Sequence, residues 1–240
     1  MVIQTRTRPV GTLSQAQIDQ GLRSYMLRVY NYMASGLALT GIVAYIVAHT
    51  GLYEALMTSG AGFIVMLAPL GIVFFMSIKL QTMKVSTAQT LFWVFSALMG
   101  ASLAYVFMRY TDASVARVFF ITAGTFGAAS LFGYTTKRDL TKMGSFLFMG
   151  LIGIIIASVV NIFLASSMMQ FIISIIGVVI FTGLTAYDTQ RIKADYIEYA
   201  YATGTDEAGK RSVYDALSLY LNFINLFSLL LNLLGVRNND

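Results

Sequence analysis

The sequence contains no cysteine, one histidine, one tryptophan and two prolines among its 240 residues. Without cysteine, the chain has no disulfide, no thiolate metal ligand and no thiol nucleophile. Charge is also scarce, because Asp, Glu, Lys and Arg make up 11% of the residues, whereas a soluble domain carries about 25%. From Met143 to Tyr187 there is neither a charged residue nor a histidine. The chain therefore has too little charge to cover a surface that faces water.

Apolar residues are abundant instead, at 57% of the chain, with a mean hydropathy of +0.72. One membrane-spanning helix needs about 20 apolar residues, and uncharged windows of that length recur along the chain. We predict an all-α membrane protein in which a tail (1–25) precedes one seven-helix transmembrane domain (26–236). The uncharged double window divides at NIFLASS (161–167), whose small and polar residues suit a tight turn. The predicted helices lie at about 26–48, 56–79, 88–109, 115–134, 143–164, 168–188 and 213–235.

The distribution of positive charge predicts the orientation in the membrane. Thirteen of the 16 Lys and Arg residues fall before the first helix or in the loops after the second, fourth and sixth helices. The three others are Arg109, Arg117 and Arg237. Because Lys and Arg resist translocation, we expect a cytoplasmic N-terminus and tail and an external C-terminus. Topology then accounts for the net charge of +5, and no nucleic-acid partner is expected; the partner is the lipid bilayer.

The last predicted helix has a polar face along its whole length. With a rotation of 100° per residue, its polar residues fall within roughly 100° of one another. These residues are Asp215, Ser218, Asn222, Asn225 and Asn232. Lipid would disfavour such a face, so we expect it to look into the bundle. It is either a hydrogen-bonded seam between helices or the lining of an ion pathway, and the aspartate and three asparagines favour the pathway.

Asp188 follows directly after the uncharged run, near the cytoplasmic end of the sixth helix. Asp215 and Asn222 belong to the next helix, which begins on the same side, so the three residues are expected at one level of the bundle. One alternative is that Asp188 pairs only with Arg191 or Lys193 at the membrane boundary, since residues three positions apart on a helix are neighbours. Ionisable residues inside membrane segments are more often functional, which favours a role in an ion pathway.

Three classes of membrane enzyme or cofactor protein fit the sequence poorly. An aspartyl protease would need Asp188 and Asp215 as a proton-sharing pair, and Asp215 lacks a glycine-flanked motif. A serine protease needs a histidine inside the bundle, whereas His49 ends the first helix. A retinal protein needs a lysine in the last helix, and residues 212–240 contain none. We therefore expect no enzyme activity and no cofactor.

Four segments resemble the Bax inhibitor motif family of seven-helix membrane proteins. They are VYNYMASGLALTG (29–41), GYTTKRDL (133–140), GLTAYDTQRIK (183–193) and ALSLYLNFINLF (216–227). The first is similar to helix 1 of bacterial members, which implies the inner membrane of a bacterium. The resemblance implies a calcium-permeable leak whose last helix is central, gated by two aspartates near the cytoplasmic side.

One family aspartate matches Asp188, and the second matches Asn222, so this chain has an amide where the family has an acid. A carboxylate pair that shares a proton is therefore absent. The family's basic latch on the acidic pair has Lys79 as its nearest candidate. We expect transient calcium binding at Asp188, because calcium prefers oxygen ligands. The alternative function is a non-conducting, stress-related regulator that binds other membrane proteins.

Overall fold

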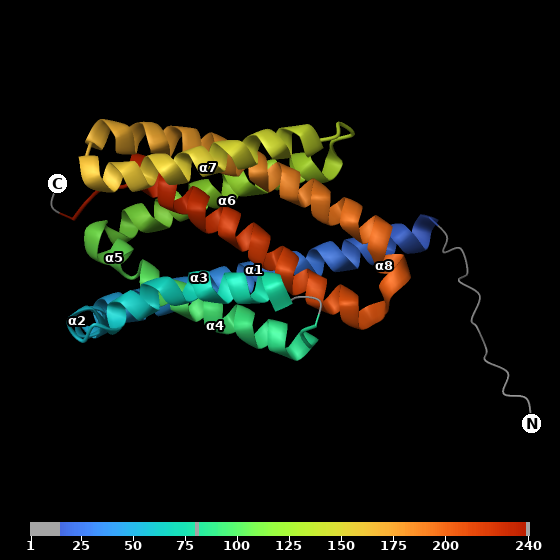
Figure 1. Ribbon diagram of the computed structural model, residues 1–240, viewed down its shortest axis with the longest axis horizontal. Helices are drawn as coiled ribbons and strands as arrows, with labels where there is room; N and C mark the ends of the chain where they lie inside the picture. The colour runs from blue at the N-terminus through green and yellow to red at the C-terminus, as the bar shows by residue number, and fades with distance from the viewer. Residues whose placement is uncertain (1–14, 80–81, 239–240) are drawn as a thin grey trace, which may run out of the picture.

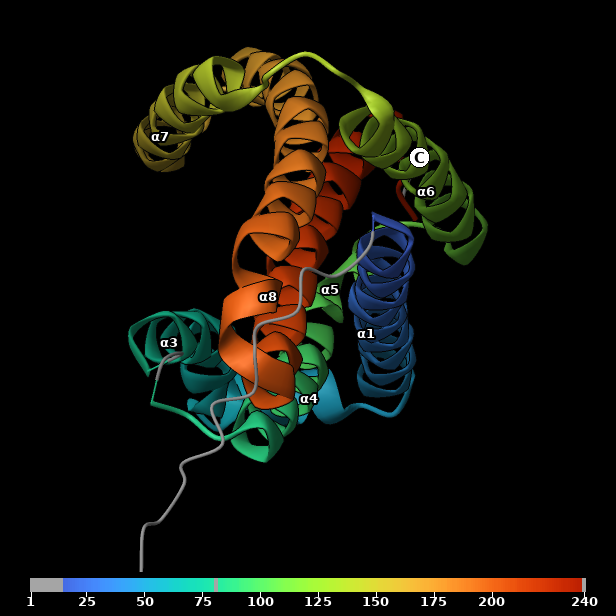
Figure 2. The same ribbon diagram turned by 90° about the vertical axis from the view of Figure 1, so that its right-hand side faces the viewer.

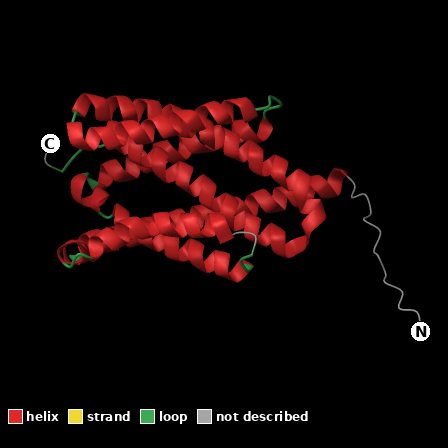
Figure 3. Ribbon diagram, in the orientation of Figure 1, coloured by secondary structure: helices red, strands yellow, loops and turns green. Residues whose placement is uncertain are grey.

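A computed structural model of the chain describes residues 15–79 and 82–238. Nearly all of this part is helical (Figure 3). An isolated antiparallel bridge joins Tyr110 to Arg237. The helices are α1 (Gln15–His49), α2 (Leu52–Thr58), α3 (Ala61–Lys79), α4 (Val85–Leu103), α5 (Tyr105–Arg109), α6 (Asp112–Thr135), α7 (Thr141–Leu164) and α8 (Ser167–Leu234). Within these described residues, seven helical segments are long and apolar enough to cross a membrane. The predicted class, a seven-helix membrane protein, is confirmed.

Helix α8 contains two of the seven spans, which we call the outbound arm (Ser167–Glu198) and the return arm (Ala208–Leu234). A straight helix would place residues 188 and 222 about 51 Å apart. Their side chains instead form a hydrogen bond of 2.7 Å, so the helix folds back on itself. Figure 1 shows this path as an orange arm that runs outward and a red arm that returns. The sequence predicted two helices (168–188 and 213–235) joined by a loop, whereas the connection is helical.

The N-terminal boundary also differs from the prediction. Helix α1 begins at Gln15, inside the predicted tail (1–25), and residues 1–14 lie outside the described residues. The added turns are amphipathic, since Leu22, Tyr25 and Met26 are buried against the bundle. A helix that buries such a face is stabilised by tertiary packing although it carries polar residues outside.

Further boundaries reflect local backbone chemistry. Gly51 and Gly60 take φ of 72° and 75° and flank α2, a short helix that the sequence did not predict as separate. Glycine adopts this left-handed conformation without strain. The predicted turn at 161–167 is present: Asn161 accepts a hydrogen bond from the backbone N–H of Ser166 at 3.0 Å, and Ala165 is left-handed.

The return arm is the central element of the bundle. It carries fully buried side chains such as Tyr220, Leu219 and Leu226, all at 0% exposure. The end view shows α8 between the α3 and α4 side and the α6 and α7 side (Figure 2). Helices α3 and α7 are peripheral and expose large hydrophobic residues such as Phe63, Phe74 and Phe163. This arrangement, apolar outside and partly polar within, is the one that a bilayer requires.

Candidate functional site

Asp188 lies inside the bundle because the outbound arm presents one buried face over residues 184–192. Leu184, Thr185, Asp188 and Ile192 follow at helical spacing, and each is at most 5% exposed. The Thr185 hydroxyl donates its hydrogen bond to the carbonyl of Phe181 and therefore does not donate to Asp188. A carboxylate buried at this position needs both charge compensation and hydrogen bonds.

The partners of Asp188 come from both arms of α8. Asn222 donates a hydrogen bond from Nδ2 to Oδ2 of Asp188 at 2.7 Å, and the Ser218 hydroxyl donates to the same oxygen at 3.1 Å. Arg191 places Nη2 at 2.9 Å from Oδ1. We call Asp188, Arg191, Ser218 and Asn222 the carboxylate cluster. Its two charges compensate each other, and the two donors satisfy the second carboxylate oxygen.

Arg191 is the more accessible of the two charged members of the carboxylate cluster. Its side chain is 32% exposed, against 7% for Asp188, and it also donates from Nη2 to the Ser218 hydroxyl at 3.3 Å. Its Nε is buried and has no hydrogen-bond partner among the residues that the structure describes. The guanidinium is therefore anchored through one nitrogen and open to solvent on another side. Of the two charged side chains, the guanidinium therefore loses less burial if it moves out of the cluster.

Asp215 lies on the return arm but belongs to a different contact. The hydroxyl of Tyr25 on α1 donates a hydrogen bond of 2.6 Å to Oδ2 of Asp215, and both residues are buried. The ring of Tyr25 packs against that of Tyr196 on the outbound arm, with centroids 4.9 Å apart. Asp215 thus ties α1 to α8, and no hydrogen bond or ion pair joins it to Asp188 in the described part of the chain.

The remaining predicted residues lie away from the cluster. Asn225 is exposed, and its amide donates to the carbonyl of Leu221 on its own helix at 2.8 Å. Asn232 is also exposed and accepts a hydrogen bond from the hydroxyl of Tyr110 at 3.1 Å. Lys79 is exposed at the end of α3, and neither ion pair found among the described residues includes it.

Arg191 and Tyr25, which contact Asp188 and Asp215, were not among the residues predicted for the site. The sequence indicated Arg191 only as a structural partner of Asp188, and Tyr25 falls within the predicted tail. The spacing of Leu22, Tyr25, Met26 and Val29, apolar on one helical face, was a signal for the longer helix. Lys193, the other cation considered for Asp188, instead donates to the carbonyl of Tyr134 at 2.9 Å.

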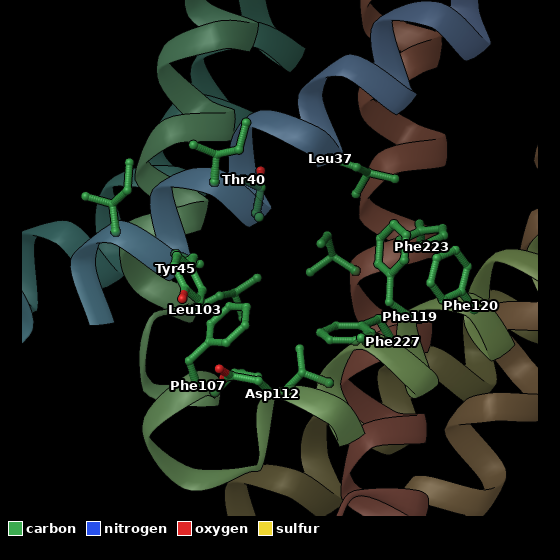
Figure 4. Close-up of a pocket in the computed structure, with 18 residues that line it drawn as sticks. Leu37, Thr40, Tyr45, Leu103, Phe107, Asp112, Phe119, Phe120, Phe223 and Phe227 are labelled. Atoms are coloured by element: carbon green, nitrogen blue, oxygen red, sulfur yellow. The ribbon is translucent and has the colours of Figure 1, made fainter. Parts of the chain in front are cut away.

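A cavity of about 450 Å³ lies beside the return arm, toward the end of the bundle where α1 ends and α6 begins (Figure 4). Phe223 and Phe227 form one wall and Leu37 lies nearby, while Thr40 and Asp112 are among its few polar residues. Apolar walls of this kind do not replace the hydration shell of an ion. In addition, no group of three or more His, Asp or Glu side chains in the described residues is placed to hold a metal.

The fold and the carboxylate cluster define a polytopic helical membrane protein with an ionisable centre enclosed by its last two spans. The chain belongs to the Bax inhibitor family: the family described as inhibitor of apoptosis-promoting Bax1 matches residues 22–239. The family membership expected from the motifs is thereby confirmed.

Similar proteins occur in several bacteria. Protein RP147 of Rickettsia prowazekii is 50% identical over 236 residues, which cover 97% of this chain and 98% of that protein. The inner membrane protein YbhL of Escherichia coli is 44% identical over 226 residues, covering 93% of this chain and 96% of YbhL. A membrane protein of Streptococcus pyogenes is 34% identical over 231 residues, covering 93% and 96%. With the seven membrane-length helices, these relatives support the expected localisation, an integral protein of the inner membrane.

Proposed function

We propose that the chain is a cation leak for which calcium is the permeant ion, and that the carboxylate cluster is its closed constriction. The observation that carries the proposal is the burial of Asp188, a carboxylate 5% exposed within a membrane-spanning arm. Burying an ionisable group at this depth is costly, and such residues usually mark ion pathways. The proposal includes no catalytic step and no resident cofactor.

The composition of the cluster supports a weak, transient calcium site. Carboxylate and amide oxygens are the ligands that calcium prefers, and Asp188 and Asn222 supply one of each. In the closed arrangement Arg191 occupies Oδ1 of Asp188 at 2.9 Å, so calcium can approach only after the guanidinium moves aside. One carboxylate and one amide hold the ion loosely, which suits passage through the membrane better than storage.

Asn222 also bears on the pH response. Two carboxylates at positions 188 and 222 would share a proton and titrate as a coupled pair. With an amide at 222, we expect the leak to depend on pH through one ionisation at most. Asp215 lies seven residues before Asn222, about 10 Å along the helix, and is expected to attract cations toward the constriction. Two further roles remain predictions: Lys79 as a latch, and Asn225 and Asn232 as residues of the outer pathway.

A second candidate function is a non-conducting regulator that binds other membrane proteins. The observation in its favour is that both oxygens of Asp188 already have partners within the chain. A cluster satisfied in this way also fits a purely structural role, in which Asp188 fixes the two arms of α8 to each other. The two functions differ in whether the protein alone moves calcium.

Calcium flux into liposomes that contain only this protein separates the two functions. We expect wild-type protein to admit calcium and Asp188→Asn to admit much less, because the neutral amide does not attract the cation. Asp19→Asn is the matched control, since it removes the same charge from an exposed position on α1. Absence of flux from folded wild-type protein would favour the regulator, and wild-type flux in Asp188→Asn would remove Asp188 from the mechanism.

A further inference from the structure

One face of α1 is unusual for a helix that spans a membrane. Between Leu27 and Ile42, no large hydrophobic side chain of α1 is exposed in the described structure. The exposed residues in this interval are Arg28, Asn31, Ala34, Ser35, Ala38 and Gly41. Polar groups that face hydrocarbon without a partner are costly. The Ser35 hydroxyl donates to the carbonyl of Tyr32 at 3.1 Å, but the side chains of Arg28 and Asn31 have no hydrogen-bond partner among the described residues. These two side chains therefore need a polar partner, unlike the face of α3, which exposes large hydrophobic residues from Phe63 to Ile78.

A cavity of about 630 Å³ opens on this face of α1. Arg28 and Asn31 line it from α1, Gln89 and Trp93 line it from α4, and Gly209 and Ser212 close it from the start of the return arm. We call it the α1–α4 cavity. Its volume falls in the range of about 300–1,000 Å³ that is typical of small-molecule sites. It is separate from the carboxylate cluster, none of whose residues lines it.

The length of α1 indicates the depth of this cavity in the bilayer. At the far end of α1, His49 lies 3.9 Å from Asp112, and this exposed ionisable pair marks one boundary of the hydrocarbon. Arg28 is 21 residues from His49, about 31 Å along the helix, and the hydrocarbon is about 30 Å thick. Arg28 therefore lies at the opposite boundary, with Asn31 about 4.5 Å deeper. Trp93, as an aromatic residue with a polar edge, suits this interfacial level.

We infer that the α1–α4 cavity binds an anionic phospholipid, with Arg28 contacting its phosphate. The guanidinium fork matches phosphate geometry, and Arg28 forms no ion pair with an acidic residue in the described part of the chain. Asn31 lies one helical turn deeper than Arg28, and its amide can donate to an ester carbonyl of a lipid whose phosphate contacts Arg28. Gln89 already donates to the Tyr32 hydroxyl at 2.6 Å, which fixes the α4 wall. Leu27 and Trp93 offer apolar surface to the acyl chains.

The single tryptophan of the chain provides a direct readout, because Trp93 lines the cavity. A lipid with brominated acyl chains quenches tryptophan fluorescence on contact. The purified full-length protein, in detergent micelles, is titrated with brominated phosphatidylglycerol or with brominated phosphatidylcholine. We expect half-maximal quenching at about fivefold lower mole fraction of phosphatidylglycerol, the preference that one arginine at a membrane surface provides.

Two substitutions test the contact. Arg28→Gln should abolish the preference, so that the two lipids quench at about the same mole fraction. Arg28→Lys keeps the charge and should retain a preference for phosphatidylglycerol. Arg23→Gln is the matched control, since Arg23 is exposed on the same helix but borders a different cavity. Gel filtration and the emission maximum of Trp93 check that each variant is folded.

Three results would overturn the inference. Equal quenching by the two lipids in the wild type would show that the cavity does not distinguish anionic headgroups. An equal loss of preference in Arg23→Gln would assign the effect to general surface charge. Recovery of fluorescence when glycerol 3-phosphate is added at no more than the concentration of brominated phosphatidylglycerol would show that the acyl chains contribute nothing to binding and that the cavity is a site for a soluble phosphate. All three readouts are independent of calcium flux, so they stand apart from the proposed function.

Discussion

Replacement of Arg191 by glutamine should increase the calcium leak. The guanidinium holds Asp188 at 2.9 Å and also donates to Ser218 at 3.3 Å, so the substitution removes the positive charge that closes the constriction in the proposed function. A hydrogen bond to a charged group contributes about 1.5–3 kcal/mol. If that energy favours the closed state, its loss raises the open population about 10- to 150-fold. Because the side chain is 32% exposed, screening places the effect near the lower bound, at about tenfold.

The assay is fluorescence-detected calcium uptake into liposomes, expressed per folded protein. This normalisation matters because Arg191→Gln leaves the buried carboxylate of Asp188 without its cation and therefore also lowers stability. Lys193→Gln is the matched control: it removes the same charge two residues away, from a lysine that bonds to the carbonyl of Tyr134 rather than to Asp188. Equal leak in wild type and Arg191→Gln would refute the reasoning, as would an equal increase in Lys193→Gln.

Three further predictions concern stability and topology. Asn222→Leu removes the 2.7 Å hydrogen bond to Asp188 and should lower the free energy of unfolding in micelles by about 1.5–3 kcal/mol. The amide of Asn225 bonds only within its own helix, so Asn225→Leu should change that free energy by less than about 0.5 kcal/mol. Gly133→Ala places a Cβ against a backbone carbonyl of α8 and should lower the melting temperature, because overpacking costs about 1–3 kcal/mol; Gly127→Ala, with open space around it, should not. A reporter fused to the C-terminus should be active outside the membrane and one in the connection between the two arms should be active in the cytoplasm, as the distribution of Lys and Arg predicts; the reverse pattern would refute the orientation.

The membrane spans were predictable because the bilayer imposes a simple length rule. Each uncharged window of about 20 residues contains a membrane-length helix, and the polar break at 161–167 became a turn. Two of the windows also contain a helix break, between α2 and α3 and between α4 and α5. The connection between the arms was not predictable in the same way. Its polar composition marks it as outside the membrane but does not distinguish a loop from a helix, and tertiary context decides between them.

The site was only partly predictable, because periodicity gives the direction of a side chain but not its partner. The 100° rotation per residue places Asn225 about 60° and Asn232 about 80° from Asn222, at the edge of the stripe. These two residues are exposed, whereas Asn222 is buried beside Asp188. The pairing of Asp188 with position 222 was implied by the family motifs. The bond between Tyr25 and Asp215 joins residues 190 positions apart, and no local pattern encodes such a contact.

These contacts bear on how the proposed constriction would open. Three residues of the return arm bond to other segments. Asn222 and Ser218 donate hydrogen bonds to Asp188 on the outbound arm, and Asp215 accepts one from Tyr25 on α1. Asp215 and Asn222 belong to the same arm. A shift of the return arm large enough to separate Asn222 from Asp188 therefore also strains the 2.6 Å hydrogen bond between Tyr25 and Asp215. Movement of Arg191 alone breaks neither bond. The smallest opening step is therefore the departure of the guanidinium, with the two arms of α8 still held together by Asn222 and Ser218.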